Sequence, residues 1–229
     1  MNYRFGNQSI TIARVRELLA IVPLLACALS TVTRATAQQV TFPTTPKDIT
    51  PPVGNTAFLE GHAVGSQGYT CLPSTTGAPS WTVNPPRPEA TLFATFFGQT
   101  VQIITHFASI NTHPNDPTKP VPLSGNATWQ SSLDTSKVWA VATGHINAGS
   151  DASCPNTGAI SCLLLQSIGS QKGPTGGKVM TKTTFIQRLN TNGGSAPDDG
   201  CVAATDVGNQ RLVPYTADYY FFRQDKGEK

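Results

Sequence analysis

Most of this chain lacks an excess of positive or negative charge. This near-neutral balance excludes a polyanion-binding function for the protein. The full sequence holds 16 Lys and Arg against 13 Asp and Glu. Without Arg4, Arg14, Arg16, Arg34 and Glu17, the chain from residue 38 onward holds 12 of each sign. Binding to nucleic acid or to anionic lipid draws on an excess of cations. We therefore expect neither a nucleic-acid partner nor attachment to an anionic membrane surface.

Long hydrophobic runs are also missing, apart from a short one near the N-terminus. Arginines precede the apolar stretch LLAIVPLLACALS, residues 18–30, and the small-residue pattern ATA ends at Ala37. This order is typical of a secretory signal peptide. A membrane anchor needs about 20 apolar residues, whereas this run is shorter and contains Pro23. We predict a signal peptide over 1–37 with cleavage near Ala37, no membrane anchor, and a secreted or periplasmic protein.

Signatures of the common cofactor-dependent enzymes are absent from the sequence. No G-x-G-x-x-G segment lies between a strand and a helix, as a dinucleotide site requires. The segment GPTGGKV, residues 173–179, is no phosphate loop, because Lys172 stands at the position of the first glycine and Val179 at that of the Ser or Thr. No serine stands in a G-x-S-x-G motif. We expect no cofactor, and a dehydrogenase activity has no support in a dinucleotide-binding motif.

Helical periodicity is missing as well, because glycines and prolines, 20 and 18 in the full sequence, are scattered throughout. Several β-favouring runs are present instead. The clearest is TLFATFFGQTVQIITHF, residues 91–107. It predicts a hairpin with Gly98 and Gln99 in a type II′ turn, in which Phe96 faces Val101.

These patterns predict one all-β domain, either an antiparallel β-sandwich or a partly closed barrel with long loops and two disulfides. We place this domain at 57–225. A Pro/Thr-rich extended lead-in, 38–56, precedes it, and a short tail, 226–229, follows it.

The cysteines include no C-x-x-C pair, which favours disulfides over a zinc site. Cys27 lies in the predicted signal peptide, and the four that remain indicate two disulfides in an exported chain. Four cysteines permit three pairings, and the sequence alone does not choose among them. The short segment SCPNTGAISC makes a bond between Cys154 and Cys162 geometrically easy. This pairing leaves Cys71 with Cys201.

The C-terminal segment RLVPYTADYYFFRQ, residues 211–224, is rich in aromatic residues. Alternation places two largely apolar sets on opposite faces of a strand: Tyr215, Ala217, Tyr219 and Phe221 on one, and Thr216, Asp218, Tyr220 and Phe222 on the other. A strand packed on both sides has this pattern. We predict a core strand rather than an exposed aromatic platform.

Several segments resemble a secreted family, domain of unknown function 3455. The resemblance spans nearly the whole chain after residue 37 and rests on these segments: GSQGYTC (65–71), Trp81, PEATLF (88–93), HFA (106–108), RLNTNGGSAP (188–197) followed by Cys201, and VPYTADYYFF (213–222). In the family the H-Y-A segment runs directly into a Gly-x-x-Trp segment. Here residues 111–124 separate His106 from GNATW (125–129).

The resemblance implies an exported, mostly β protein without an agreed biochemical role. It also implies that Cys71 and Cys201 occupy the two cysteine positions of the family, in agreement with the long-range pairing. Cys154 and Cys162 are then a local addition.

Tryptophans beside loops are the candidate binding residues. Trp81 and Trp129 border Pro/Gly/Ser-rich segments, where exposure would let them stack on sugars or apolar ligands. Trp139 lies within a β-favouring run and is expected to be buried. The polar, proline-rich loop 109–126 is long enough to be functional. Our leading hypothesis is therefore a non-enzymatic structural or ligand-binding β-domain. We expect it to contact its ligand through residues 109–129, which include Trp129, with Trp81 as a further candidate.

The partner itself is unknown; an envelope or extracellular glycan and an apolar ligand are the candidates. The alternative is a metal-dependent enzyme whose ligands, His62, His106 and His145, converge from different strands. Their spacing forms no H-x-H or H-x-x-x-H pair. Each is better explained as a hydrogen-bonded structural histidine.

Overall fold

The computed structural model describes residues 40–75 and 77–225, which form an all-β domain. The predicted signal peptide (1–37), Cys27 and the tail (226–229) lie outside the described residues. Eight strands follow one another along the chain: β1 (Asn55–Leu72), β2 (Ser80–Phe96), β3 (Gln99–Ser109), β4 (Asn126–Ser131), β5 (Lys137–Ile146), β6 (Cys162–Gln171), β7 (Thr183–Gly193) and β8 (Gln210–Gln224).

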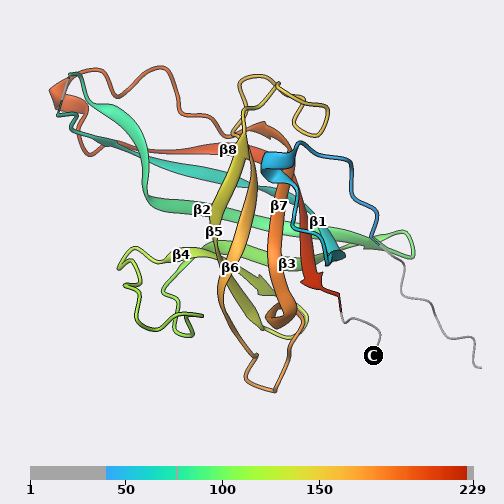
Figure 1. The fold of residues 1–229 in the computed structure, drawn as a ribbon. Helices are drawn as coiled ribbons and strands as arrows, with labels where there is room; N and C mark the ends of the chain where they lie inside the picture. The colour runs from blue at the N-terminus through green and yellow to red at the C-terminus, as the bar shows by residue number, and fades with distance from the viewer. Residues whose placement is uncertain (1–39, 76, 226–229) are drawn as a thin grey trace, which may run out of the picture. The chain divides into compact units, whose positions relative to one another are not determined.

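The strands form a closed antiparallel barrel, which confirms the predicted all-β antiparallel fold (Figure 1). The prediction left open a sandwich or a partly closed barrel, and the barrel is closed by the pairing of β8 with β1. Each strand pairs with its neighbour in sequence, and β8 pairs with β1 from Asn55 opposite Gln224 to Thr70 opposite Gln210. Closure gives every strand a partner on both sides over at least part of its length. Barrels of eight strands have an interior that side chains fill or that holds one small ligand.

The β2–β3 hairpin differs from its prediction by one residue. Its turn residues are Phe97 and Gly98, so Phe96 pairs with Gln99 and not with Val101. Both turn residues have positive φ, 51° and 77°. Positive φ at both central positions defines a type I′ turn, whose twist matches that of the flanking strands. The prediction placed glycine first because a type II′ turn requires it there.

The barrel interior is filled by the inner cluster, to which every strand contributes. Its largest fully buried members include Trp129, Tyr219, Phe221, Leu92, Ile104 and Ile186. Tyr215 and Ala217 also belong to it. One face of β8 therefore lies in the core, as predicted.

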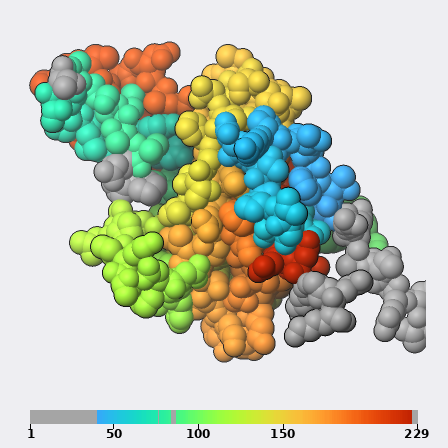
Figure 2. Space-filling model, in the orientation of Figure 1, coloured from blue at the N-terminus to red at the C-terminus, as the bar shows by residue number. Residues whose placement is uncertain are grey.

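The opposite face of β8 packs in a second, outer cluster, where Tyr220 and Phe222 meet Ile49 and Leu164. Ile49 ends the 3-10 turn η1 (Lys47–Ile49), is 0% exposed, and accepts a 2.6 Å hydrogen bond from Gln187 Nε2 through its carbonyl. The part of the lead-in from residue 40 onward thus covers the outer face of the barrel, where Figures 1 and 2 show it in blue.

Four connections, including the three longest, begin and end at one end of the barrel, which we call the mouth: residues 73–79, 110–125, 147–161 and 194–209. The connection 172–182, which contains η2, is at the other end. Both predicted disulfides are confirmed, and both lie at this end. Cys71–Cys201 joins the end of β1 to the connection before β8, and Cys154–Cys162 closes the connection before β6. Disulfides are typical of proteins in oxidising compartments.

Helical structure in the described part of the chain is limited to three 3-10 turns: η1, η2 (Met180–Lys182) and η3 (Ala204–Asp206). None of them has the length and hydrophobicity to cross a membrane.

Candidate functional site

The mouth opens into a cavity of about 570 Å³, the mouth cavity. Ligand pockets commonly span about 300–1,000 Å³. Most of its wall is apolar and includes Val83, Pro88, Ala127, Ala142, Ile160 and Leu163. Six polar residues also line it: Gln67, Tyr69, His106, Ser161, Arg188 and Ser195. An apolar wall with a few polar groups is the usual composition of a small-molecule site.

Stacked aromatic rings lie behind the inner part of this cavity. His106 and Trp129 face each other on β3 and β4, and their rings stack with centroids 4.1 Å apart at an angle of 10°. Tyr219 tilts against both, at 5.7 and 6.0 Å. Its hydroxyl lies 3.2 Å from that of Tyr215. His106 therefore joins the cavity to the aromatic interior of the barrel.

His106 is an uncharged hydrogen-bonding group. Burial lowers its pKa to about 3, the bond to the Thr128 carbonyl acts in the opposite direction, and the positive charge of Arg188 lowers the pKa further. Nδ1 lies 2.9 Å from the Thr128 carbonyl oxygen and must donate to it. Nε2 of the neutral ring is then an acceptor. An imidazole with so low a pKa is a weak base.

Arg188 is the cation of the cavity. It lies on β7 and its Nη2 donates to the Ser161 carbonyl at 2.8 Å. Its Nε is buried and has no acceptor among the described residues. Nearby, the Tyr69 hydroxyl donates to the Gly194 carbonyl at 2.6 Å. Burial raises the pKa of Tyr69 and the charge of Arg188 opposes that rise, so Tyr69 stays protonated.

A family model described as "Protein of unknown function (DUF3455)" matches residues 52–223. The chain belongs to this family. Neither a comparison with curated proteins nor one with solved structures gave a match.

Several of the segments by which this DUF3455 chain resembles its family line the mouth cavity. GSQGYTC supplies Gln67 and Tyr69, HFA supplies His106, and RLNTNGGSAP supplies Arg188 and Ser195. Residues 111–124, which separate HFA from GNATW, lie in the 110–125 connection, and β3 and β4 on either side of it pair with each other. The cavity therefore belongs to the part of the fold that the family match covers.

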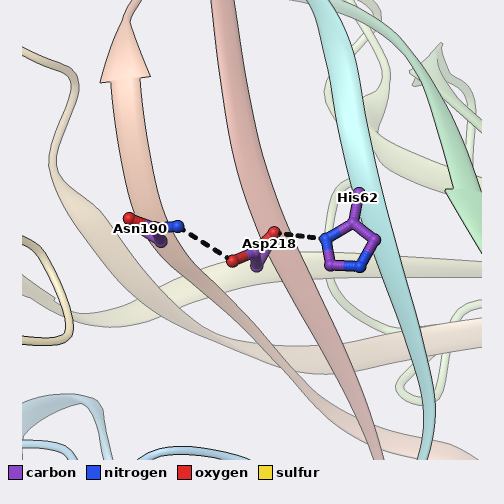
Figure 3. A network of polar contacts seen from close by, with 3 residues as sticks. All are labelled: His62, Asn190 and Asp218. Atoms are coloured by element: carbon purple, nitrogen blue, oxygen red, sulfur yellow. Dashed lines mark hydrogen bonds and ion pairs between the residues drawn. The ribbon is translucent and has the colours of Figure 1, made fainter.

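The three histidines of the metal hypothesis do not converge. His62 is exposed on β1, where its Nδ1 lies 2.6 Å from Asp218 Oδ1, while Asn190 Nδ2 donates to Asp218 Oδ2 at 3.1 Å (Figure 3). His106 is inside the barrel, and His145 is exposed on β5. No group of three or more His, Cys, Asp or Glu residues within 40–75 and 77–225 is arranged to hold a metal ion. Alternation of strand faces separates these side chains.

The tryptophans proposed as binding residues take different positions from those expected. Trp129 is 1% exposed, because its side chain faces the barrel interior, so its expected exposure is wrong. Trp81 is partly exposed and its Nε1 donates to the Asp199 carbonyl at 2.9 Å. Trp139 is buried as expected, and its Nε1 donates to Ser109 Oγ at 2.9 Å. The mouth cavity is lined by neither Trp81 nor Trp129 among its described residues.

The long loop forms a second, separate cavity of about 430 Å³ against β5 and β6. Figure 2 shows this part of the chain in yellow-green. Its polar side chains hold the loop in place: Asn111 Nδ2 donates to the Ile168 carbonyl at 3.1 Å and Asn115 Nδ2 to the Ser167 carbonyl at 3.0 Å. These two groups are already engaged, whereas Asn126 Nδ2, which also lines this cavity, has no acceptor among the described residues, as Arg188 Nε has none. A contact role for the loop stays a prediction, and Trp129 is not part of it.

Arg188, Tyr69 and Gln67 were not identified as site residues from the sequence. A signal for Arg188 was present in the run TTFIQRLNT. Alternation places Arg188 on the same strand face as Ile186, which is 0% exposed in the inner cluster. A charge on the apolar face of a strand indicates either a paired ion or a functional group.

Proposed function

We propose that this DUF3455 protein is an exported, non-enzymatic binding protein that holds a small ligand in its mouth cavity. The observation that carries the proposal is the cavity itself, whose apolar wall surrounds a few polar groups at the open end of a closed barrel. An eight-stranded barrel provides a rigid frame for one small ligand. Export is supported by the two disulfides, which favour an oxidising compartment.

Binding fits the chemistry of the cavity better than catalysis does. His106 has a pKa of about 3, and no carboxylate stands among the described lining residues to activate it. The hydroxyls of Tyr69 and Ser195 donate to the backbone carbonyls of Gly194 and Gly158. Such groups orient a ligand and do not form a nucleophile with its base.

Blocking the mouth tests this proposal. Ala196 lines the cavity, so Ala196→Trp should obstruct it. Ala203 is exposed in the same 194–209 connection but does not line it, which makes Ala203→Trp the matched control. With the neutral fluorescent probe N-phenyl-1-naphthylamine, we expect saturable binding to the wild type, a loss of affinity of about tenfold or more in Ala196→Trp, and no change in the control. Equal affinity in all three proteins would exclude the mouth cavity as the binding site.

A further inference from the structure

Arg188 points into the mouth cavity with hydrogen-bonding capacity unused. On β7, Ile186 packs in the inner cluster and Gln187 bonds to the lead-in on the outer face, so alternation directs Arg188 inward. The guanidinium has five N–H donors. One terminal nitrogen donates to the Ser161 carbonyl, and the buried Nε has no acceptor among the described residues.

The charge of Arg188 also lacks a counterion in the described part of the chain. The ion pairs there join His62 to Asp218 and Lys119 to Asp116, and neither involves Arg188. The described lining of the mouth cavity contains no Asp or Glu. The field of Arg188 reaches the neutral side chains of Tyr69 and His106 and meets no opposing charge there.

The unpaired guanidinium of Arg188 favours the binding of an anion. A partly buried cation is unfavourable unless it is paired, and the planar fork of arginine matches a carboxylate through two parallel hydrogen bonds. Since His106 is uncharged, the cavity provides a single positive charge. The neutral imidazole acceptor and the apolar wall favour a body with few further charges.

We propose that the ligand of the mouth cavity is a small organic anion, an apolar or aromatic body carrying one carboxylate that pairs with Arg188. This inference rests on the proposed binding function and adds the chemical class of the ligand and the residue that selects it. The carboxylate replaces the missing counterion, and the body lies along the apolar wall toward His106.

Two probes of the same shape and different charge test the inference: 2-naphthoate and 2-naphthamide, titrated calorimetrically. We expect the wild type to bind the carboxylate about 10- to 100-fold more tightly than the amide, as a hydrogen-bonded charge pair provides. Arg188→Gln should abolish this preference, and Arg188→Lys, which keeps the charge without the fork, should retain part of it. Arg223→Gln, an exposed cation on β8, is the matched control and should leave it unchanged.

The outcomes separate the inference from the function on which it rests. Equal affinity of the wild type for both probes would overturn the anion inference and leave binding in the cavity standing. A preference that survives in Arg188→Gln would overturn the role of Arg188. If neither probe bound and the mouth-blocking variant had no effect on the neutral probe, both proposals would fail. Should Arg188→Gln not fold, a preference in Arg188→Lys as strong as in the wild type would count against the forked contact.

Discussion

His106 and Arg188 show how the barrel interior controls single side chains. Both line the mouth cavity, yet burial keeps one neutral while the other stays charged. An imidazolium ion can lose its proton near neutral pH. A buried imidazole therefore avoids the cost of desolvating a charge by becoming neutral, and its pKa is lowered as a result. A guanidinium cannot do so, because it is too strong a base to lose its proton inside a protein. The cavity therefore combines an uncharged acceptor with a permanent cation.

The low pKa of His106 predicts a dependence of stability on pH. Between the ordinary pKa of 6.5 and about 3, the unfolded chain binds a proton at His106 and the folded chain does not. Protons then favour unfolding, so this group lowers the free energy of unfolding by up to about 1.4 kcal/mol for each pH unit of acidification within that range. His106→Phe should make urea-derived stability fall less steeply between pH 6.5 and 3.5.

His145→Phe is the matched control for that measurement, because His145 is exposed on β5. In His145→Phe, the free energy of unfolding should depend on pH as it does in the wild type. Carboxylates also contribute to this dependence, and they do so equally in the wild type and in both variants. An unchanged slope in His106→Phe would show that the buried imidazole is not held neutral.

At the scale of the element, the β2–β3 hairpin carries a residue poorly suited to its turn. Phe97 has a φ of 51° and is 104% exposed, so it adopts a left-handed conformation without packing in return. The left-handed conformation costs an ordinary residue about 1–2 kcal/mol. Asparagine tolerates it and is preferred before glycine in type I′ turns.

Phe97→Asn should therefore raise the free energy of unfolding by about 1 kcal/mol, measured by denaturant titration. Phe96→Asn is the comparison, since Phe96 pairs with Gln99 within the hairpin and gains nothing from asparagine. Its stability should stay the same or fall. No gain in Phe97→Asn would contradict the assigned turn conformation.

Most elements could be predicted from local sequence because their signals are local. The β-favouring run that contains Trp139 falls within β5, and the alternating aromatics of 211–224 fall within β8. By contrast, β4 has only six residues and follows a proline-rich segment, so it was not recognised. The hairpin register was missed by one residue because glycine is compatible with two turn types.

At the scale of the whole domain, closure of the barrel creates the site, and closure is non-local. The pairing of β1 with β8 joins segments more than a hundred residues apart, and no short motif encodes it. Tyr69, His106 and Arg188 lie on three strands whose inward faces meet only after this pairing. The sequence therefore predicted the fold class and both disulfides but not the group of residues around the cavity.

The order of the strands explains why the three longest connections and both disulfides lie at the mouth. An up-and-down barrel places alternate connections at the same end, and here the three longest are at the end where both disulfides lie. The opposite end is closed in part by Met180, which is 0% exposed in the inner cluster. We therefore expect a ligand to enter the barrel through the mouth.

The three tryptophan indole N–H resonances test this claim most directly during a titration with 2-naphthoate. Trp81 and Trp139 donate to Asp199 and Ser109, whereas Trp129 stacks on His106 directly behind the cavity. We expect the Trp129 resonance to shift saturably and the other two to stay in place. A shift confined to Trp81 or Trp139, with Trp129 unmoved at saturation, would show that the ligand binds elsewhere.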